Sequence, residues 1–126
     1  MGQINSFREL DVYQLALEHS QSIYEWSLHL PKEERYGLSS QIRRSSRAVG
    51  ALIAEAWARR RYQGAFTEKL TQALAEAKET QSWLDHALAN GYLEDDQFEH
   101  FDDAFDHVCA MIRRMIQRAD RFCESG

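Results

Sequence analysis

Residues 95–122 read DDQFEHFDDAFDHVCAMIRRMIQRADRF, and the apolar residues of this stretch decide the fold. They recur at alternating spacings of three and four residues: Phe98, Phe101, Phe105, Val108, Ile112, Met115, Ala119 and Phe122. This spacing places them on one face of an α-helix, because a helix turns once in about 3.6 residues. The stretch therefore predicts an amphipathic helix over 95–122 whose apolar face must be covered by other helices.

Three further segments have helical periodicity, and turn-forming residues separate them at 31–37, 60–64 and 90–91. We expect helices over 7–30, 39–60 and 64–89, the first opened by a capping box of Ser6 and Glu9. The expected inward residues are Leu10, Tyr13, Leu17, Ser20, Tyr24 and Ser27 in the first; Leu38, Ile42, Ser45, Val49, Leu52 and Ala56 in the second; and Phe66, Leu70, Ala73, Ala77, Thr80, Leu84 and Ala87 in the third. Four such helices with short connections predict an all-α protein, an antiparallel up-down four-helix bundle that forms a single domain over 1–126.

The composition agrees with this class and excludes several others. The chain has 126 residues, of which 44% are apolar and 28% charged, a balance typical of globular proteins and not of disordered tails. One Pro and 6 Gly disfavour a sandwich or barrel, which needs many tight turns. No apolar run reaches the roughly 20 residues of a membrane span, so no membrane partner is expected. Met1-Gly2-Gln3-Ile4-Asn5 does not resemble a signal peptide and two Cys cannot form a disulfide framework, which together indicate a cytoplasmic protein.

A second face of the 39–60 helix indicates self-association. Arg47, Ala51, Ala54 and Ala58 follow one another at spacings of four and three on the side opposite the inward residues. Small side chains let another helix approach closely, and Trp26 lies among apolar residues that extend the first helix beyond one stripe. We expect these five residues to form an oligomer interface. The alternative is a helix rich in alanine only because alanine favours helix formation.

Several short motifs follow one another along the chain. They are Phe7-Arg8-Glu9-Leu10, Glu34-Arg35-Tyr36-Gly37-Leu38-Ser39, Ile53-Ala54-Glu55, Glu79-Thr80-Gln81 and Gly91-Tyr92-Leu93. In this order, from about Phe7 to Phe122, they resemble the four-helix-bundle family of the 23S rRNA intervening-sequence proteins, which is related to the accessory variability proteins of retroelements. The resemblance implies a small cytosolic bacterial protein that assembles into a ring-like homopentamer. Most members of the family have no established activity.

The chain departs from the family pattern in two respects. Where the family often reads Ile-Pro-x-Asn-Ile-Ala-Glu-Gly, residues 49–56 read Val-Gly-Ala-Leu-Ile-Ala-Glu-Ala, so a role tied to that Asn does not carry over to Leu52. The formal net charge of -5 also separates this chain from the basic, nucleic-acid-binding retroelement relatives.

Charge is unevenly distributed along the chain. Residues 39–61 hold one Glu and six Arg, namely Arg43, Arg44, Arg47, Arg59, Arg60 and Arg61. Guanidinium groups bind phosphates in two-point geometry, so these six residues could form a surface for RNA or DNA. Residues 94–106 hold seven acidic residues and no Lys or Arg, so the arginines could instead pair with this acidic stretch, within or between subunits.

Residues for catalysis or metal binding are less evident. Asp96, His100, Asp103 and His107 form a stripe with metal-ligand chemistry, but it lies away from the apolar face and reads as a solvated acidic surface. Glu55 and Glu79 could form an acid–base pair, but no nucleophile or phosphate loop accompanies them, so they and Gln81 are interpreted as hydrogen-bonding residues that fix helix register. We therefore expect no catalytic, cofactor-binding or metal-binding residues. The expected function is that of a non-enzymatic, self-assembling scaffold or binding protein. The alternative is an RNA- or DNA-binding accessory protein, and other protein partners stay open.

Overall fold

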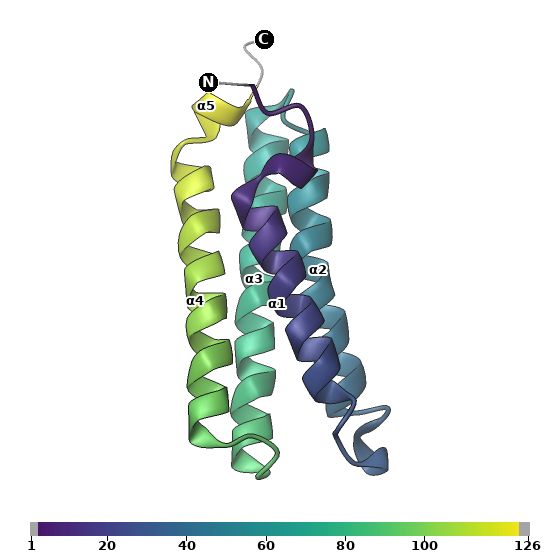
Figure 1. Ribbon diagram of the computed structural model, residues 1–126. Helices are drawn as coiled ribbons and strands as arrows, with labels where there is room; N and C mark the ends of the chain where they lie inside the picture. Colours follow the sequence, from purple (N-terminus) through teal and green to yellow (C-terminus); the bar gives the residue numbers. More distant parts are fainter. Residues whose placement is uncertain (1–2, 124–126) are drawn as a thin grey trace.

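The computed structural model describes residues 3–123, which form four long helices and no strand (Figure 1). The long helices are α1 (Asp11–Ser27), α2 (Leu38–Ala58), α3 (Gln63–Ala89) and α4 (Asp95–Gln117). Three short elements accompany them: η1 (Phe7–Glu9), η2 (Lys32–Glu34) and α5 (Ala119–Phe122). The all-α class with four long helices is confirmed. The start of the segment that does not resemble a signal peptide, Met1 and Gly2, and residues 124–126 of the expected domain lie outside the described residues.

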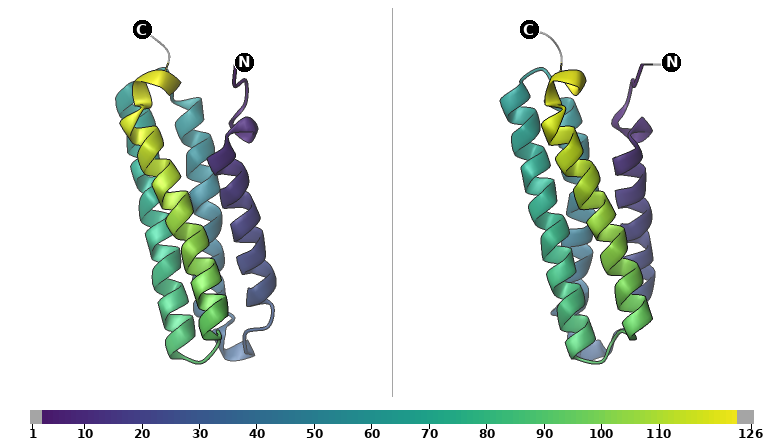
Figure 2. Two further views of the ribbon diagram at one scale, coloured as in Figure 1. Left: turned by 60° about the vertical axis from the view of Figure 1, so that its left-hand side comes forward. Right: turned by 90° about the vertical axis from the view of Figure 1, so that its left-hand side faces the viewer.

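The four long helices lie side by side around a shared apolar core. Contacts join α1 to α2, α2 to α3, α3 to α4 and α4 to α1, whereas the diagonal pairs α1–α3 and α2–α4 do not approach each other. In the right-hand view of Figure 2, α4 lies in front, α3 and α1 lie on either side of it, and α2 lies behind. The outer surface between α1 and α2 therefore faces away from the outer surface between α3 and α4.

The core follows the periodicity of α3 and α4. All seven inward residues expected in α3 are buried. In α4 and α5 the expected residues from Phe101 to Ala119 are buried, while Phe98 and Phe122 are half-buried at the edges. None of the described helices is both long and apolar enough to cross a membrane.

The first helix is shorter than predicted, and its buried face is rotated from the expected one, although Leu10, Ser20 and Ser27 are buried as expected. Leu10 has extended backbone angles, so α1 begins at Asp11, and Ser6 caps η1 by accepting the Arg8 N–H at 3.2 Å. The buried residues of α1 are Val12, Ala16, Ser20, Ile23 and Ser27. Leu17, expected inside, is 54% exposed. Small side chains on the buried face let the α1 backbone approach the core, whereas Tyr13 and Tyr24 are half-buried at its edge.

The last helix is interrupted where the sequence predicted continuity. Arg118 has φ -111° and ψ 30°, which ends α4 at Gln117 and turns the chain into α5. The turn brings the Phe122 ring over the Phe66 ring of α3, with centroids 6.1 Å apart. The helix predicted over 95–122 is thus divided into α4 and α5, and after the break the Phe122 side chain packs on α3.

Hydrogen bonds in the connecting loops cap the ends of the helices. Gly91 has φ +78°, as its predicted turn requires, and the Tyr92 N–H donates to the Ala87 carbonyl at 2.8 Å to close α3. The Glu34 carboxylate accepts the Leu38 N–H at 3.1 Å and so caps the start of α2. The same carboxylate accepts the Tyr92 hydroxyl at 3.0 Å, which joins the loop before α2 to the loop before α4.

Candidate functional site

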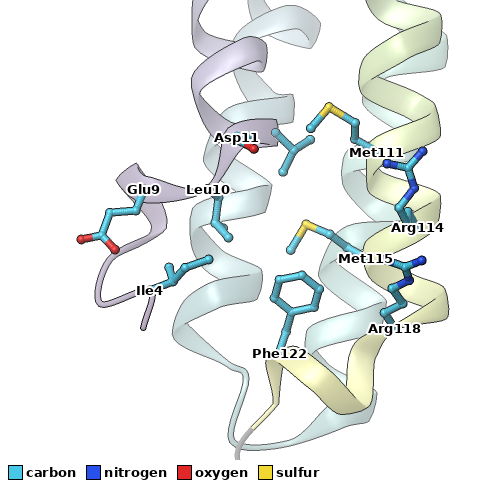
Figure 3. Close-up of a pocket in the computed structure, with 10 residues that line it drawn as sticks. Ile4, Glu9, Leu10, Asp11, Met111, Arg114, Met115, Arg118 and Phe122 are labelled. Atoms are coloured by element: carbon cyan, nitrogen blue, oxygen red, sulfur yellow. The ribbon is translucent and has the colours of Figure 1, made fainter. Parts of the chain in front are cut away.

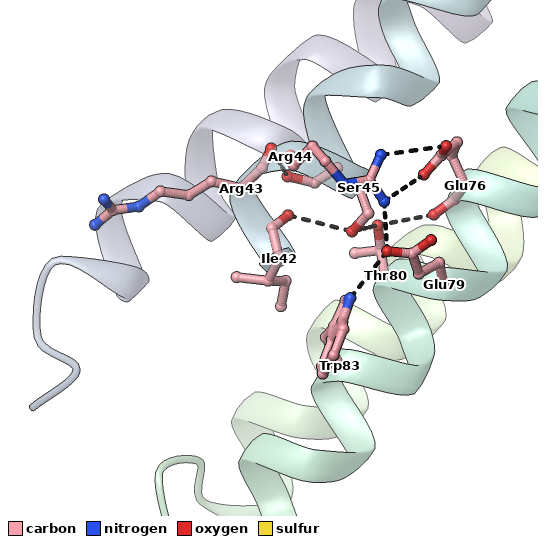
Figure 4. Close-up of polar contacts among 9 residues, drawn as sticks. Ile42, Arg43, Arg44, Ser45, Glu76, Glu79, Thr80 and Trp83 are labelled. Carbon is pink, nitrogen blue, oxygen red and sulfur yellow. Dashed lines mark hydrogen bonds and ion pairs between the residues drawn. The ribbon is translucent and has the colours of Figure 1, made fainter. Parts of the chain in front are cut away.

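Arg44 of α2 is bound to two carboxylates of α3 (Figure 4). Its guanidinium donates to Glu76 at 3.1 Å and also to Glu79, and the Trp83 indole N–H donates to Glu79 at 3.1 Å. The Trp83 and Arg44 hydrogen bonds lower the pKa of Glu79, and the two carboxylates raise the pKa of Arg44. Arg44 is therefore committed to joining α2 with α3.

Beside this network, a pair of buried hydroxyls joins the same two helices. Ser45 and Thr80 Oγ atoms lie 2.8 Å apart, and Thr80 also donates to the Glu76 carbonyl at 3.0 Å. Both side chains are fully buried, and no buried polar side-chain atom among residues 3–123 lacks a partner. Ser45 and Thr80, two polar residues of the expected inward stripes, thus satisfy each other, whereas Ser20 and Ser27 of the first helix donate to backbone carbonyls of that helix.

Arg43 and Arg47 turn away from this network toward α1. Their guanidinium carbons lie 5.0 and 5.1 Å from the centre of the Tyr24 ring, and Arg43 Nε donates to Ser27 Oγ at 2.7 Å. Figure 4 shows the Arg43 side chain pointing away from that of its neighbour Arg44. Neither Arg43 nor Arg47 forms an ion pair within the described part of the chain. Both cations are thus held over one aromatic ring, and Arg43 is also held by a hydroxyl.

The remaining arginines lie at the far end of α2. At 1.5 Å per residue, Arg60 is roughly 25 Å along the helix from Arg43. Its guanidinium lies 4.0 Å from the centre of the Trp57 ring and donates to the Trp57 carbonyl at 2.9 Å. Arg61 lies over Tyr62, and Arg59 is exposed. The six arginines expected to form one surface are thus divided among three places.

The acidic stretch of α4 does not meet the basic part of α2 within one chain. The two helices are diagonal in the bundle, and the partners of Arg44 come from α3 instead. Gln81 of α3 donates to Asp102 at 3.2 Å and to Asp106 at 2.8 Å. Burial raises the pKa of Asp102, and the nearby charges of Asp106 and Asp85 raise it further. The expectation of pairing within a subunit is therefore wrong for α2 and α4.

The proposed interface residues do not all share one surface. Arg47, Ala51 and Ala58 are exposed on the outer side of α2, and Ala54 beside them is half-buried. Trp26 instead lies on the α4 side of α1: its indole N–H donates to the Tyr92 carbonyl at 3.3 Å, and its ring centre lies 6.0 Å from that of Phe101. Trp26 therefore cannot extend the α2 surface, because α1 holds it toward the opposite neighbour.

Two exposed apolar residues that the sequence did not predict for this surface lie on the outside of the first helical segment, one in α1 and one directly after it. Leu17 is 54% exposed and Leu28 is 58% exposed. They are eleven positions apart, close to three full turns, so they lie on the same side of the helix. The sequence placed Leu17 in the core because it fits the inward stripe with Tyr13 and Tyr24. Its spacing of eleven residues from Leu28 is the signal that could have placed it on the outer surface.

A small cleft lies where α1 begins and α4 ends, between the N-terminal segment and α4 (Figure 3). Met111, Met115 and Phe122 point into it from one wall, and Ile4 and Leu10 form the other. Its volume is about 210 Å³. The charged residues of the cleft, among them Arg114 and Arg118, lie at its rim, and the Glu9 side chain points away from it.

The residues considered for catalysis and metal binding lie apart. Glu55 pairs with Lys69 at 3.1 Å, whereas Glu79 pairs with Arg44, so the two carboxylates occupy different levels of the bundle. Across residues 3–123, no three His, Cys, Asp or Glu side chains are grouped to hold a metal ion. Burial raises the pKa of the Cys109 thiol, which disfavours the reactive thiolate.

Comparison with known proteins points to one family. The family described as 23S rRNA-intervening sequence protein matches residues 8–114. A protein of unknown function from the S23 ribosomal protein family of Bacteroides thetaiotaomicron has a similar solved structure, with a TM-score of 0.77 and 29% sequence identity. The similarity covers 84% of this chain and 95% of that one. No curated protein matches.

Proposed function

Because this chain belongs to the 23S rRNA-intervening sequence protein family, we propose that it is a non-enzymatic protein that assembles with copies of itself. In this proposal it serves as an oligomeric scaffold or binding protein in the cytoplasm, and the family resemblance favours a homopentamer. Its subunit is an antiparallel up-down bundle. The pairing of Arg44 with Glu76 and Glu79, and of Glu55 with Lys69, supports opposite directions for α2 and α3.

The observation that carries the proposal is the outer surface of α1 and α2. Leu17 of α1 and Leu28, directly after α1, are more than half exposed, and Ala51 and Ala58 are exposed on α2. Exposed apolar area that is shared by two adjacent helices is costly in water and is typical of contact surfaces. Small residues on α2 leave room for a helix of another copy.

The native mass tests this proposal. Light scattering after size exclusion should give a multiple of the 14.7 kDa chain for the wild type. Leu17→Gln with Leu28→Gln should shift the mass toward that of one chain, because both substitutions remove apolar area from the proposed contact. Tyr36→Gln with Tyr62→Gln is the matched control, since these side chains are 86% and 64% exposed elsewhere. A wild-type mass of one chain would contradict self-assembly.

One observation favours RNA or DNA binding as a second candidate. Arg43 and Arg47 have no carboxylate partner among the described residues, so their N–H groups could meet phosphates. Binding to labelled duplex DNA or structured RNA should then weaken with salt, by a log–log slope near -0.9 per neutralised phosphate for duplex DNA. Absence of binding at low salt would contradict RNA or DNA binding and would leave contact between copies as the proposed role of Arg43 and Arg47.

A further inference from the structure

The two outer surfaces that face away from each other carry opposite charges. On the α1–α2 surface, Arg43 and Arg47 are held over Tyr24. The shared Tyr24 ring places both guanidinium groups in one region, although like charges repel, and the Ser27 hydrogen bond further fixes Arg43. This arrangement leaves two cations without a carboxylate within residues 3–123.

The α3–α4 surface carries a cluster of carboxylates. Gln81 holds Asp102 and Asp106 together through hydrogen bonds, and Asp85 is close enough to act on Asp102. Only Lys78 approaches this cluster as a cation in the described chain, with Nζ 3.8 Å from Asp106. The raised pKa of Asp102 reflects burial and this crowding of negative charge. The cluster therefore has more negative charge than its own subunit compensates.

The two charged groups lie at the same height along the bundle. Arg44, next to Arg43, reaches Glu79, and Ser45 reaches Thr80. Gln81 follows Thr80 in α3 and reaches Asp102 and Asp106 across to α4. Hydrogen bonds from α2 to Thr80 and from its sequence neighbour Gln81 to α4 thus place the cations and the carboxylates at similar heights on opposite sides of the molecule.

We infer that the α1–α2 surface of one copy docks on the α3–α4 surface of the next, with Arg43 and Arg47 opposite Asp85, Asp102 and Asp106. This inference rests on the proposed self-assembly and names its two surfaces. The contact joins different surfaces of two copies, and such contacts form rings when successive copies are related by rotation alone. Equal height of the two charged groups favours that closure. The exposed Leu17, Leu28 and Ala51 supply apolar contact around the charges.

Charge reversal tests the inference. Arg43→Glu with Arg47→Glu places like charges on both surfaces, and so does Asp102→Lys with Asp106→Lys. Each double variant should weaken assembly by at least about 100-fold, because facing like charges cost several kcal/mol and each 1.4 kcal/mol is tenfold. One chain with all four substitutions again has opposite charges and should regain the wild-type mass. Arg114→Glu with Arg118→Glu is the matched control, since these exposed arginines have the same spacing on another surface.

The possible outcomes separate this inference from the proposed function. A monomeric wild type contradicts self-assembly itself. An assembled wild type whose double variants keep the full mass contradicts only the surfaces named here, as does a failure of the fourfold variant to reassemble while its circular dichroism is native. If a reversed variant does not fold, Arg43→Gln with Arg47→Gln and Asp102→Asn with Asp106→Asn replace it. These neutral pairs should weaken assembly in a salt-dependent way, and unchanged affinity would overturn the inference.

Discussion

Arg43 and Arg44 are adjacent in sequence, yet they have different partners. Successive helical residues point about 100° apart, so Arg44 reaches the carboxylates of α3 while Arg43 reaches Tyr24 of α1. A count of arginines in the sequence cannot make this distinction. At this scale, the neighbour that each side chain meets decides whether it stabilises the subunit or is available for a partner.

The Arg44 network predicts an acid-sensitive contribution to stability. The pKa of Glu79 is lower when folded, so the ionised form is favoured and its contribution is full above the unfolded pKa of about 4.3. The contribution disappears as the pH falls through the lower, folded pKa. Glu79→Gln should therefore reduce the free energy of unfolding at pH 7 by about 0.2–1 kcal/mol, the range of solvent-exposed ion pairs, and by almost nothing near pH 2.

Urea denaturation at the two pH values measures this difference. Glu25→Gln is the control, because Glu25 is exposed and forms no ion pair within residues 3–123. An equal loss for Glu79→Gln at both pH values would mean that packing, and not ionisation, is responsible.

Among the elements, α1 is the one whose orientation the sequence did not determine. Its residues form two neighbouring apolar stripes, one with Tyr13 and Leu17 and one with Ala16 and Ile23. Periodicity identifies both but does not rank them. The choice depends on how closely α1 can approach its neighbours, which is a property of the packed bundle. In α3 a single stripe exists, and all seven residues expected to face inward are buried, together with Gln81 beside them.

The rotation of α1 predicts opposite outcomes for two substitutions. Ile23 is fully buried, so Ile23→Ala should lower the free energy of unfolding by about 2–5 kcal/mol, through lost burial and the cavity left behind. Leu17→Ala should change the subunit stability by less than about 0.5 kcal/mol, because the side chain is exposed. Denaturation at concentrations that dissociate any assembly compares the two. A larger loss of unfolding free energy for Leu17→Ala than for Ile23→Ala would contradict this orientation of α1 and support the one predicted from the sequence, with Leu17 inside.

For the whole molecule, the sequence predicted the helices and their short connections but not which surfaces they share. Helix periodicity is local, whereas the diagonal placement of α2 and α4 follows from how four helices close around one core. For this reason the six arginines lie in three places and Trp26 lies on the α4 side of α1, while their roles in binding and assembly stay predictions. The interface residues of α2 stay a prediction that only the assembled protein can test.

The packing also predicts uneven local stability. The apolar cleft of about 210 Å³ leaves the N-terminal segment and the end of α4 with unfilled contacts, whereas α2 and α3 are joined by buried hydroxyls and ion pairs. Amide hydrogen exchange, measured by mass spectrometry, should be fast in η1 and α5 and slowest in the middle of α2 and α3. Equal protection of α5 and α3 would contradict this gradient.

Tyr92 links the two halves of the chain at one end of the bundle. Its hydroxyl donates to Glu34, which caps α2, and its carbonyl accepts the Trp26 indole of α1. A slip of one half against the other by a single turn, about 5.4 Å, would break both bonds. In the proposed assembly, the same slip would add a translation along the axis at every contact between subunits. The subunits would then form an open helical filament instead of a closed ring. If copies assemble as proposed, the two hydrogen bonds of Tyr92 would fix the register that keeps successive subunits at the same height.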